Sequence, residues 1–207
     1  MNQPAAQPVR APINLALPPE MALRAGAYRL LANLLCNAPS ADLLGQLAAA
    51  DAQDDGTDDV GAALEALGLA ASAIPAEQVA DEYQALFIGV GRGELLPYGS
   101  WYLTGFLMEK PLGLLRDHLM QLGFERSDDV AEPEDHVAAL CEVMSLLITD
   151  QASHETQQEF FERHMSPWFG RFFGDLQAAQ GARFYRAVGL FGSAFTDLEI
   201  TYFAMRL

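Results

Sequence analysis

The chain has 207 residues, and its 28 acidic side chains outnumber the 12 basic ones for a formal net charge of −16. Hydrophobic residues make up 51% of the composition, which excludes the signature of an intrinsically disordered chain. The negative balance argues against nucleic acid and against anionic lipid as partners, because binding to either needs a basic surface. A charged partner is therefore expected to be basic.

The N-terminal residues lack the pattern of a targeting signal. Five prolines interrupt residues 1–19, and no apolar run typical of a secretory signal peptide occurs there. The segment also lacks adjacent arginines, so the chain is not expected to be a twin-arginine export substrate itself. We expect residues 1–18 to form a flexible proline-rich tail and residues 19–207 to form a single all-helical domain in the cytoplasm.

The first half of this domain has the apolar periodicity of helices. One helix is expected from about Glu20 to Cys36, and Ser40 is expected to cap a short second helix. A further helix is expected from Asp58 to Leu67, and Pro75 is expected to open another. The residues predicted on the buried face of that last helix are Val79, Tyr83, Leu86 and Phe87.

Prolines and glycines also divide the second half into helices. Lys110-Pro111 places a proline in the first turn of a helix that is expected to end near Gly123. The later helices are expected from Glu132 to about Thr149, from Glu155 to Ser166, from Pro167 towards Ala179, and onwards from Phe184. The last helix has a predicted apolar seam of Phe184, Val188, Phe191, Phe195, Leu198 and Tyr202. With no alternating strand pattern, the fold class is all-α, an irregular bundle of about eight to ten helices without a membrane span.

Motifs for catalysis and for metal binding are not recognisable. Cys36 and Cys141 lie in apolar patterns and are expected to be buried free thiols. The acidic loop Asp51–Asp59 lacks the bidentate glutamate of a calcium loop, and the four histidines lack metal-ligand spacing. No nucleophile motif occurs either. We therefore predict no catalytic residue, no metal and no cofactor, and hence a protein that is not an enzyme.

The glycine-rich run Gly89–Gly93 has some likeness to a phosphate-binding loop. It follows a helix rather than a strand and lacks the spacing of a nucleotide-binding motif. A flexible turn is the favoured interpretation. Weak nucleotide contact through Arg92 and His136 stays an alternative.

Two segments carry features that a helical bundle alone does not require. The first runs from Glu82 to Tyr102 and places aromatic and apolar residues on a glycine-containing loop, either as core residues or as the wall of a binding groove. The second reads Glu-Pro-Glu-Asp-His over residues 132–136 and is expected in the first turn of a helix. Its acids could simply complement the positive helix end, but His136 is not explained in that way.

Together these two segments resemble the TorD/DmsD family of cytoplasmic chaperones for twin-arginine-exported molybdoenzymes. The first matches the family pattern E-Y-x-x-L-F-x-G-x-G…P-Y-x-S-x-Y, and the second matches E-x-x-D-H. Leu96 departs from the pattern, because many members carry a second proline before Pro97. The resemblance implies an all-helical fold and binding of the signal peptide of a molybdopterin-containing oxidoreductase. It also implies that the client is held until its cofactor is inserted, by a monomer or a domain-swapped dimer.

A twin-arginine leader offers two guanidinium groups followed by an apolar stretch, so its receptor needs carboxylates beside an apolar groove. We expect Asp135, with Glu132 or Glu134, to meet the arginines, and His136 to orient Asp135 or to bind the peptide backbone. The signal-peptide-binding residues predicted in this way are Glu82, Leu86, Phe87, Pro97, Tyr98, Ser100, Trp101, Tyr102, Glu132, Glu134, Asp135 and His136. Two alternatives stay open, namely a nucleotide- or molybdenum-cofactor-handling protein without peptide binding, and a helical interaction protein of another kind.

Overall fold

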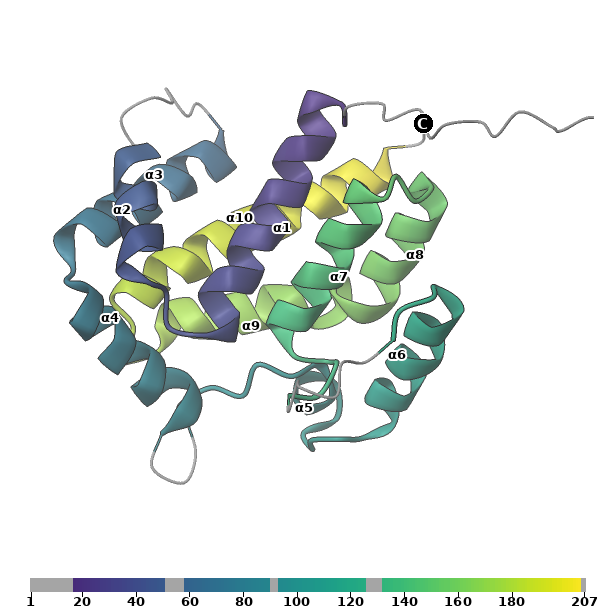
Figure 1. Cartoon of the computed structure of the whole chain (residues 1–207). Helices are drawn as coiled ribbons and strands as arrows, with labels where there is room; N and C mark the ends of the chain where they lie inside the picture. The colour runs from purple at the N-terminus through teal and green to yellow at the C-terminus, as the bar shows by residue number, and fades with distance from the viewer. Residues whose placement is uncertain (1–16, 51–57, 90–92, 126–131, 206–207) are drawn as a thin grey trace, which may run out of the picture.

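The computed structural model describes residues 17–50, 58–89, 93–125 and 132–205. These residues form ten α-helices and one π-helical segment, with a single isolated β-bridge and no longer strand (Figure 1). The all-α fold class is therefore confirmed. Residues 1–16 of the predicted tail and residues 51–57 of the acidic loop lie outside the description, so the predictions on them stay predictions.

The helices divide the chain as follows. They are α1 (Pro19–Cys36), α2 (Ala41–Ala50), α3 (Asp59–Ala73), α4 (Ala76–Tyr83) with the π-helical η1 (Gln84–Ile88), α5 (Gly99–Thr104), α6 (Lys110–Gln121), α7 (Val137–Thr149), α8 (His154–His164), α9 (Ser166–Ala178) and α10 (Phe184–Ala204). In Figure 1, α1 crosses in front of α10 and lies beside α7, whereas α2, α3 and α4 form one end of the bundle and α5 and α6 lie at the other.

Most helix ends lie where local signals predict them. The Ser40 hydroxyl accepts a hydrogen bond from the Leu43 N–H at 3.2 Å, and the Asp58 carboxylate accepts one from the Gly61 N–H at 2.7 Å. Gly123, with φ of 82°, follows α6 as the predicted C′ glycine. The helix predicted to end at Leu67 continues to Ala73, because its last turns are rich in alanine.

One element prediction is wrong. The helix expected from Glu132 begins only at Val137, and residues 132–136 form an irregular segment ahead of it. The short helix α5, Gly99–Thr104, has no counterpart among the predicted helices. The starts of α5 and α7 lie next to each other at the isolated bridge between Tyr98 and His136.

The core lies between α1, α7, α9 and α10. A buried ion pair ties α1 to α10, with Arg24 Nε 2.7 Å from Glu199 Oε1, and the Tyr28 hydroxyl donates to the same carboxylate at 2.8 Å. Close packing of α9 on α10 depends on Gly192, where an added Cβ would lie 2.2 Å from the Phe173 ring. This frame holds α7 in place and so determines where residues 132–136 emerge.

The predicted apolar seam of α10 is correct for its first half only. Phe184, Val188, Phe191 and Phe195 are buried, whereas Leu198 is exposed and Tyr202 is half-buried. The burial of Glu199 against Arg24 places Leu198 on the outer side of the helix. The two thiols also differ from expectation, since Cys141 is buried but Cys36 is exposed at the end of α1.

Among the described residues, no single helix has both the length and the apolar character to cross a bilayer. One pair, Asp59–Ala73 and Ala76–Ile88, meets that test jointly by length and composition, with a bend of 112° between the two helices.

Candidate functional site

The two motif segments, some 35 residues apart in the chain, meet in an antiparallel bridge between Tyr98 and His136. The Gly99 N–H donates to the Asp135 carbonyl and the Val137 N–H donates to the Pro97 carbonyl, each at 2.9 Å. Backbone pairing therefore sets the start of α5 against the start of α7. The structure thus brings the end of the first motif, around residues 97–100, against residues 135–137 of the second.

Asp135 lies at the centre of this junction. Its Oδ2 accepts a hydrogen bond from the Ser100 N–H at 2.7 Å, and the residue is only 3% exposed. Its Oδ1 is also buried and has no hydrogen-bond partner among the described residues. Because an unpartnered buried carboxylate oxygen is costly in a folded protein, this atom marks a position where a donor from a ligand would be favourable.

Glu132 and Tyr98 form the exposed edge of the junction. The Tyr98 hydroxyl donates a hydrogen bond to the exposed Glu132 carboxylate. Partial burial, together with the neighbouring Glu132 carboxylate, raises the pKa of Tyr98 well above its ordinary value. Tyr98 therefore stays a neutral donor that holds Glu132 beside Asp135.

His136 caps α7, and its predicted contact with a peptide backbone stays a prediction. Its Nδ1 accepts a hydrogen bond from the Ala138 N–H at 3.2 Å and so caps α7, while its ring contacts the Tyr98 ring edge-on at 5.1 Å. Burial lowers the pKa of His136 to about 4, which keeps the imidazole neutral near pH 7. It therefore offers no cation to a phosphate, and no side-chain hydrogen bond joins it to Asp135 in the described part of the chain.

Glu134, unlike Glu132 and Asp135, forms an ion pair with an arginine of the described chain. Its Oε2 lies 2.8 Å from Nη2 of Arg116 on α6, in an ion pair that is half-exposed on the arginine side. Within the described ranges, neither Glu132 nor Asp135 forms an ion pair with a cation. The junction thus retains two carboxylates whose charge is not compensated by an ion pair in that part of the chain.

The aromatic residues of α5 lie half-buried next to these carboxylates. Tyr102 stacks on Trp168 of α9 at 5.4 Å, and its hydroxyl donates to Asp175 at 3.0 Å. Gly99 permits a close approach, because a Cβ there would lie 3.2 Å from the Trp168 indole nitrogen. Trp101 is also half-buried. α5 is therefore held by aromatic packing beneath the junction.

Three other predicted site residues are structural in this fold. The buried Glu82 carboxylate accepts hydrogen bonds from the N–H groups of the first residues of α10, with distances of 2.8, 3.1 and 2.7 Å to Arg183, Phe184 and Tyr185. Leu86 and Phe87 are buried in the core, where Phe87 packs against Tyr185 at 5.3 Å. The core alternative for these aromatic and apolar residues is therefore the one the packing supports.

The glycine-rich turn does not form a phosphate cradle in its described part. A Cβ on Gly93 would lie 2.5 Å from the Phe87 carbonyl carbon, so this glycine is needed for close packing. Arg92 lies outside the described residues, and its predicted nucleotide contact stays a prediction. No group of three or more metal-ligating side chains occurs within the described ranges.

Comparison with known proteins identifies the family of this chain. Residues 53–174 match the family described as nitrate reductase delta subunit. The chain belongs to this family. It is 30% identical over 118 residues to a Haemophilus influenzae protein named "Probable Tat proofreading chaperone DmsD" and 25% identical over 139 residues to a Vibrio atlanticus protein named "Chaperone protein TorD". The resemblance to TorD/DmsD chaperones is therefore confirmed.

These matches are partial in length. They cover 55% and 61% of this chain and 56% and 65% of the two relatives, which is less than two thirds of either. A solved redox enzyme maturation protein from Archaeoglobus fulgidus has the same fold, with a TM-score of 0.55 and 18% identity. That similarity covers 92% of this chain and 99% of the solved one.

Two features have no counterpart in the sequence predictions. The buried His118 and His164, from α6 and α8, are joined by a 2.8 Å hydrogen bond between Nδ1 and Nε2. The second is a run of exposed apolar residues between α5 and α6. Helical periodicity in the sequence predicts neither feature. The two histidines are 46 residues apart, and the exposed apolar run lies between helices rather than on one.

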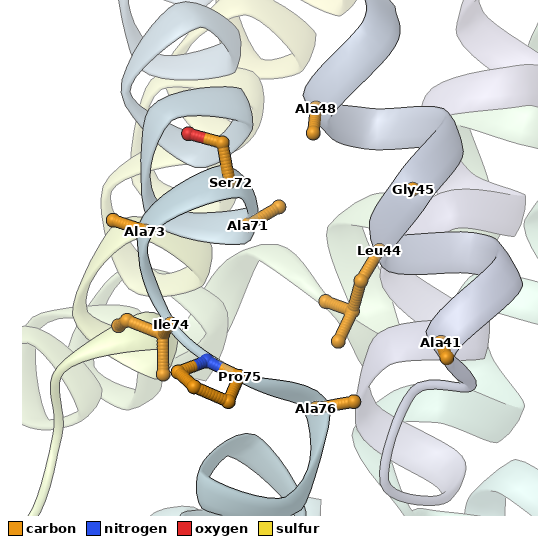
Figure 2. Close-up of a pocket in the computed structure, with 10 residues that line it drawn as sticks. All are labelled: Ala41, Leu44, Gly45, Ala48, Ala71, Ser72, Ala73, Ile74, Pro75 and Ala76. Atoms are coloured by element: carbon orange, nitrogen blue, oxygen red, sulfur yellow. The ribbon is translucent and has the colours of Figure 1, made fainter.

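A pocket of about 340 Å³ lies elsewhere, between α2 and the end of α3. Figure 2 shows its lining of small and apolar side chains, including Leu44, Ala48, Ala71 and Ile74, with Ser72 as the one hydroxyl. Figure 1 places these helices at the opposite end of the bundle from α5 and α6. The pocket therefore does not belong to the junction of the two motifs.

Proposed function

We propose that the protein is a cytoplasmic chaperone that binds the twin-arginine signal peptide of a molybdopterin-containing oxidoreductase. It would hold the client for cofactor insertion before export. The observation that carries this proposal is the junction itself, where residues of both family motifs pair and leave the exposed Glu132 and the buried Asp135 without a compensating ion pair in the described chain. Family membership and the names of the relatives support the same function.

Two carboxylates suit two arginines for a physical reason. A guanidinium group presents a planar fork of donors that pairs with a carboxylate in two parallel hydrogen bonds, each worth about 1.5–3 kcal/mol when charge-assisted. Glu132 is exposed and reachable at once, whereas Asp135 has a buried Oδ1 that needs a donor. A peptide that binds both would have an affinity in the micromolar range, about −8 kcal/mol. Such an affinity permits later release of the client.

Isothermal titration calorimetry of the full chain with a synthetic twin-arginine leader tests this proposal. We expect one peptide per chain, and a dissociation constant about tenfold higher for Asp135→Asn or Tyr98→Ala. Glu20→Gln on α1, remote from the junction, serves as the control and should leave the constant unchanged. Absence of binding to the wild-type chain, particularly together with saturable binding of GTP, would overturn the proposal in favour of nucleotide handling.

A further inference from the structure

Large apolar side chains are exposed between α5 and α6, directly after the junction. Three of them are consecutive, with Phe106 68% and Met108 74% exposed on either side of Leu107. Leu103 at the end of α5 and Leu114 on α6 are exposed as well. We call these five residues the apolar ledge. Runs of exposed apolar residues are uncommon on monomeric soluble proteins and mark surfaces that bind another molecule.

The backbone holds the ledge in a defined conformation. Gly105 and Met108 both have left-handed φ values, of 83° and 59°. For methionine this region is unfavourable and persists only where the surroundings impose it. The Thr104 hydroxyl donates to the Ser100 carbonyl at 2.8 Å and accepts from the Phe106 N–H at 3.2 Å. The ledge is thus a built feature whose apolar side chains are displayed in a fixed order.

Ser100 connects the ledge to the carboxylates. Its N–H donates to Asp135 Oδ2 at 2.7 Å, and its hydroxyl accepts from the Met108 N–H at 3.2 Å. Ser100 is completely buried, so neither contact depends on solvent. One residue therefore fixes the distance and direction between the acidic junction and the apolar ledge.

The charged residues near the ledge indicate which end of a bound molecule would carry positive charge. On the junction side lie Glu132 and Asp135, without an ion-pair partner among the described residues, while Arg116 is already paired with Glu134. At the start of α6 the exposed Glu109 and Lys110 offset each other. Near Leu103, the exposed Arg171 of α9 donates a hydrogen bond to the Tyr102 carbonyl. The two carboxylates without an ion-pair partner among the described residues therefore lie on the junction side of the ledge. An occupant that is complementary to this arrangement carries positive charge at one end and an apolar stretch next to it.

We propose that the apolar ledge receives the apolar stretch of the leader, while its arginines meet Glu132 and Asp135. This inference rests on the proposed function and deepens it. The apolar residues expected at the signal-peptide site are Leu86, Phe87, Pro97, Tyr98 and Trp101, of which Leu86 and Phe87 are buried in the core, and the ledge supplies exposed apolar side chains in their place. The leader then runs from the junction across Ser100 onto the ledge.

The test is a titration of two leader peptides into the wild-type chain and the double variant Phe106→Ser/Met108→Ser. One peptide has both arginines and the apolar stretch, and in the other the apolar stretch is replaced by serines. For the intact leader we expect the variant to raise the dissociation constant at least tenfold. For the serine leader, wild type and variant should bind equally. Leu23→Ser on α1, where the side chain is 76% exposed, is the matched control and should bind both peptides as wild type does.

The outcomes are distinguishable. An intact leader that binds wild type and the ledge variant equally well overturns the inference and leaves the proposed function standing. An intact leader that does not bind wild type at all overturns the proposed function, and the inference with it. A variant that changes self-association in sedimentation equilibrium while leaving peptide binding unchanged overturns the inference too, because the occupant is then a second copy of the chain. Circular dichroism of each variant checks that the helical content is retained.

Discussion

At the scale of single residues, the buried carboxylates of Glu82 and Asp135 differ in how many of their oxygens have hydrogen-bond partners. The Glu82 carboxylate accepts hydrogen bonds from three backbone N–H groups, those of Arg183 and of the first two residues of α10, so both of its oxygens have partners. The Asp135 carboxylate accepts one hydrogen bond at Oδ2, and its buried Oδ1 has no partner in the described chain. The first pattern is typical of a structural acid, and the second is consistent with the ligand-binding role proposed for Asp135.

Glu82→Ala tests the structural half of this contrast. It leaves the N–H groups at the start of α10 without acceptors, and we expect the free energy of unfolding to fall by about 3 kcal/mol. Glu94→Ala is the control, because Glu94 also accepts from two backbone N–H groups but is exposed to water, and its cost should stay below about 1 kcal/mol. Urea unfolding measures both. Equal losses for the two variants would contradict the account of Glu82.

The histidine cap of α7 makes stability depend on pH. The pKa of His136 is about 4 in the fold, below the value of about 6.5 in an unfolded chain, so the unfolded state takes up protons first as pH falls. The stabilisation is therefore complete above about pH 6.5 and is lost as pH falls towards 4, by about 2 kcal/mol between pH 7.5 and pH 5.

His136→Asn measures that contribution, because asparagine is a good N-cap that does not titrate. We expect its free energy of unfolding to fall less than that of wild type between pH 7.5 and pH 5. Some pH dependence should remain, since burial also lowers the pKa of His118 and of His164. Identical pH profiles for variant and wild type would show that His136 does not titrate as described.

At the scale of the elements, local signals predict where helices end but not which segments pair across the fold. Ser40, Asp58, Pro111 and Gly123 act within one turn of their own helices, and the predictions made from them are confirmed. The starts of α5 and α7 depend instead on hydrogen bonds between residues 97–100 and 135–137. No spacing in the sequence encodes that pairing, so the helix was expected five residues too early.

The packing of α9 on α10 gives a prediction at this scale. A methyl group at position 192 would overlap the Phe173 ring, so we expect Gly192→Ala to lower the free energy of unfolding by about 3 kcal/mol. Gly174→Ala, on an exposed position of α9 with open space around it, should raise it by about 0.5–1 kcal/mol. Thermal unfolding compares the two, and a stabilising Gly192→Ala would contradict the close contact.

At the scale of the whole molecule, the proposed site combines residues that the sequence identifies with residues that it does not. Tyr98, Glu132 and Asp135 could be predicted, because they lie within short motifs whose chemistry suits a basic peptide. The burial of Leu86 and Phe87 and the exposure of Phe106 and Met108 could not, since apolar residues look alike in a sequence whether they face the core or solvent. Only the path of the chain around α5 separates the two groups.

We expect the net charge of −16 to affect the rate at which a basic leader associates more than the contacts in the complex. A strongly negative protein attracts a basic leader over distances comparable to the screening length, which is about 10 Å at 0.1 M salt. We expect the association rate constant to fall about tenfold between 0.05 and 0.5 M salt, with a smaller change in the dissociation rate constant. Stopped-flow fluorescence measures both, and an association rate independent of salt would contradict a role for this charge.

In the proposed complex, Glu132 and Asp135 meet the two arginines of a leader. A double-mutant cycle measures this contact, with dissociation constants for wild type and Glu132→Gln, each titrated with a twin-arginine leader and with the same leader carrying two glutamines. We expect Glu132→Gln to weaken binding of the twin-arginine leader at least fivefold and to leave the glutamine leader unaffected, a coupling of about 1 kcal/mol. Equal effects of Glu132→Gln on both peptides would contradict it.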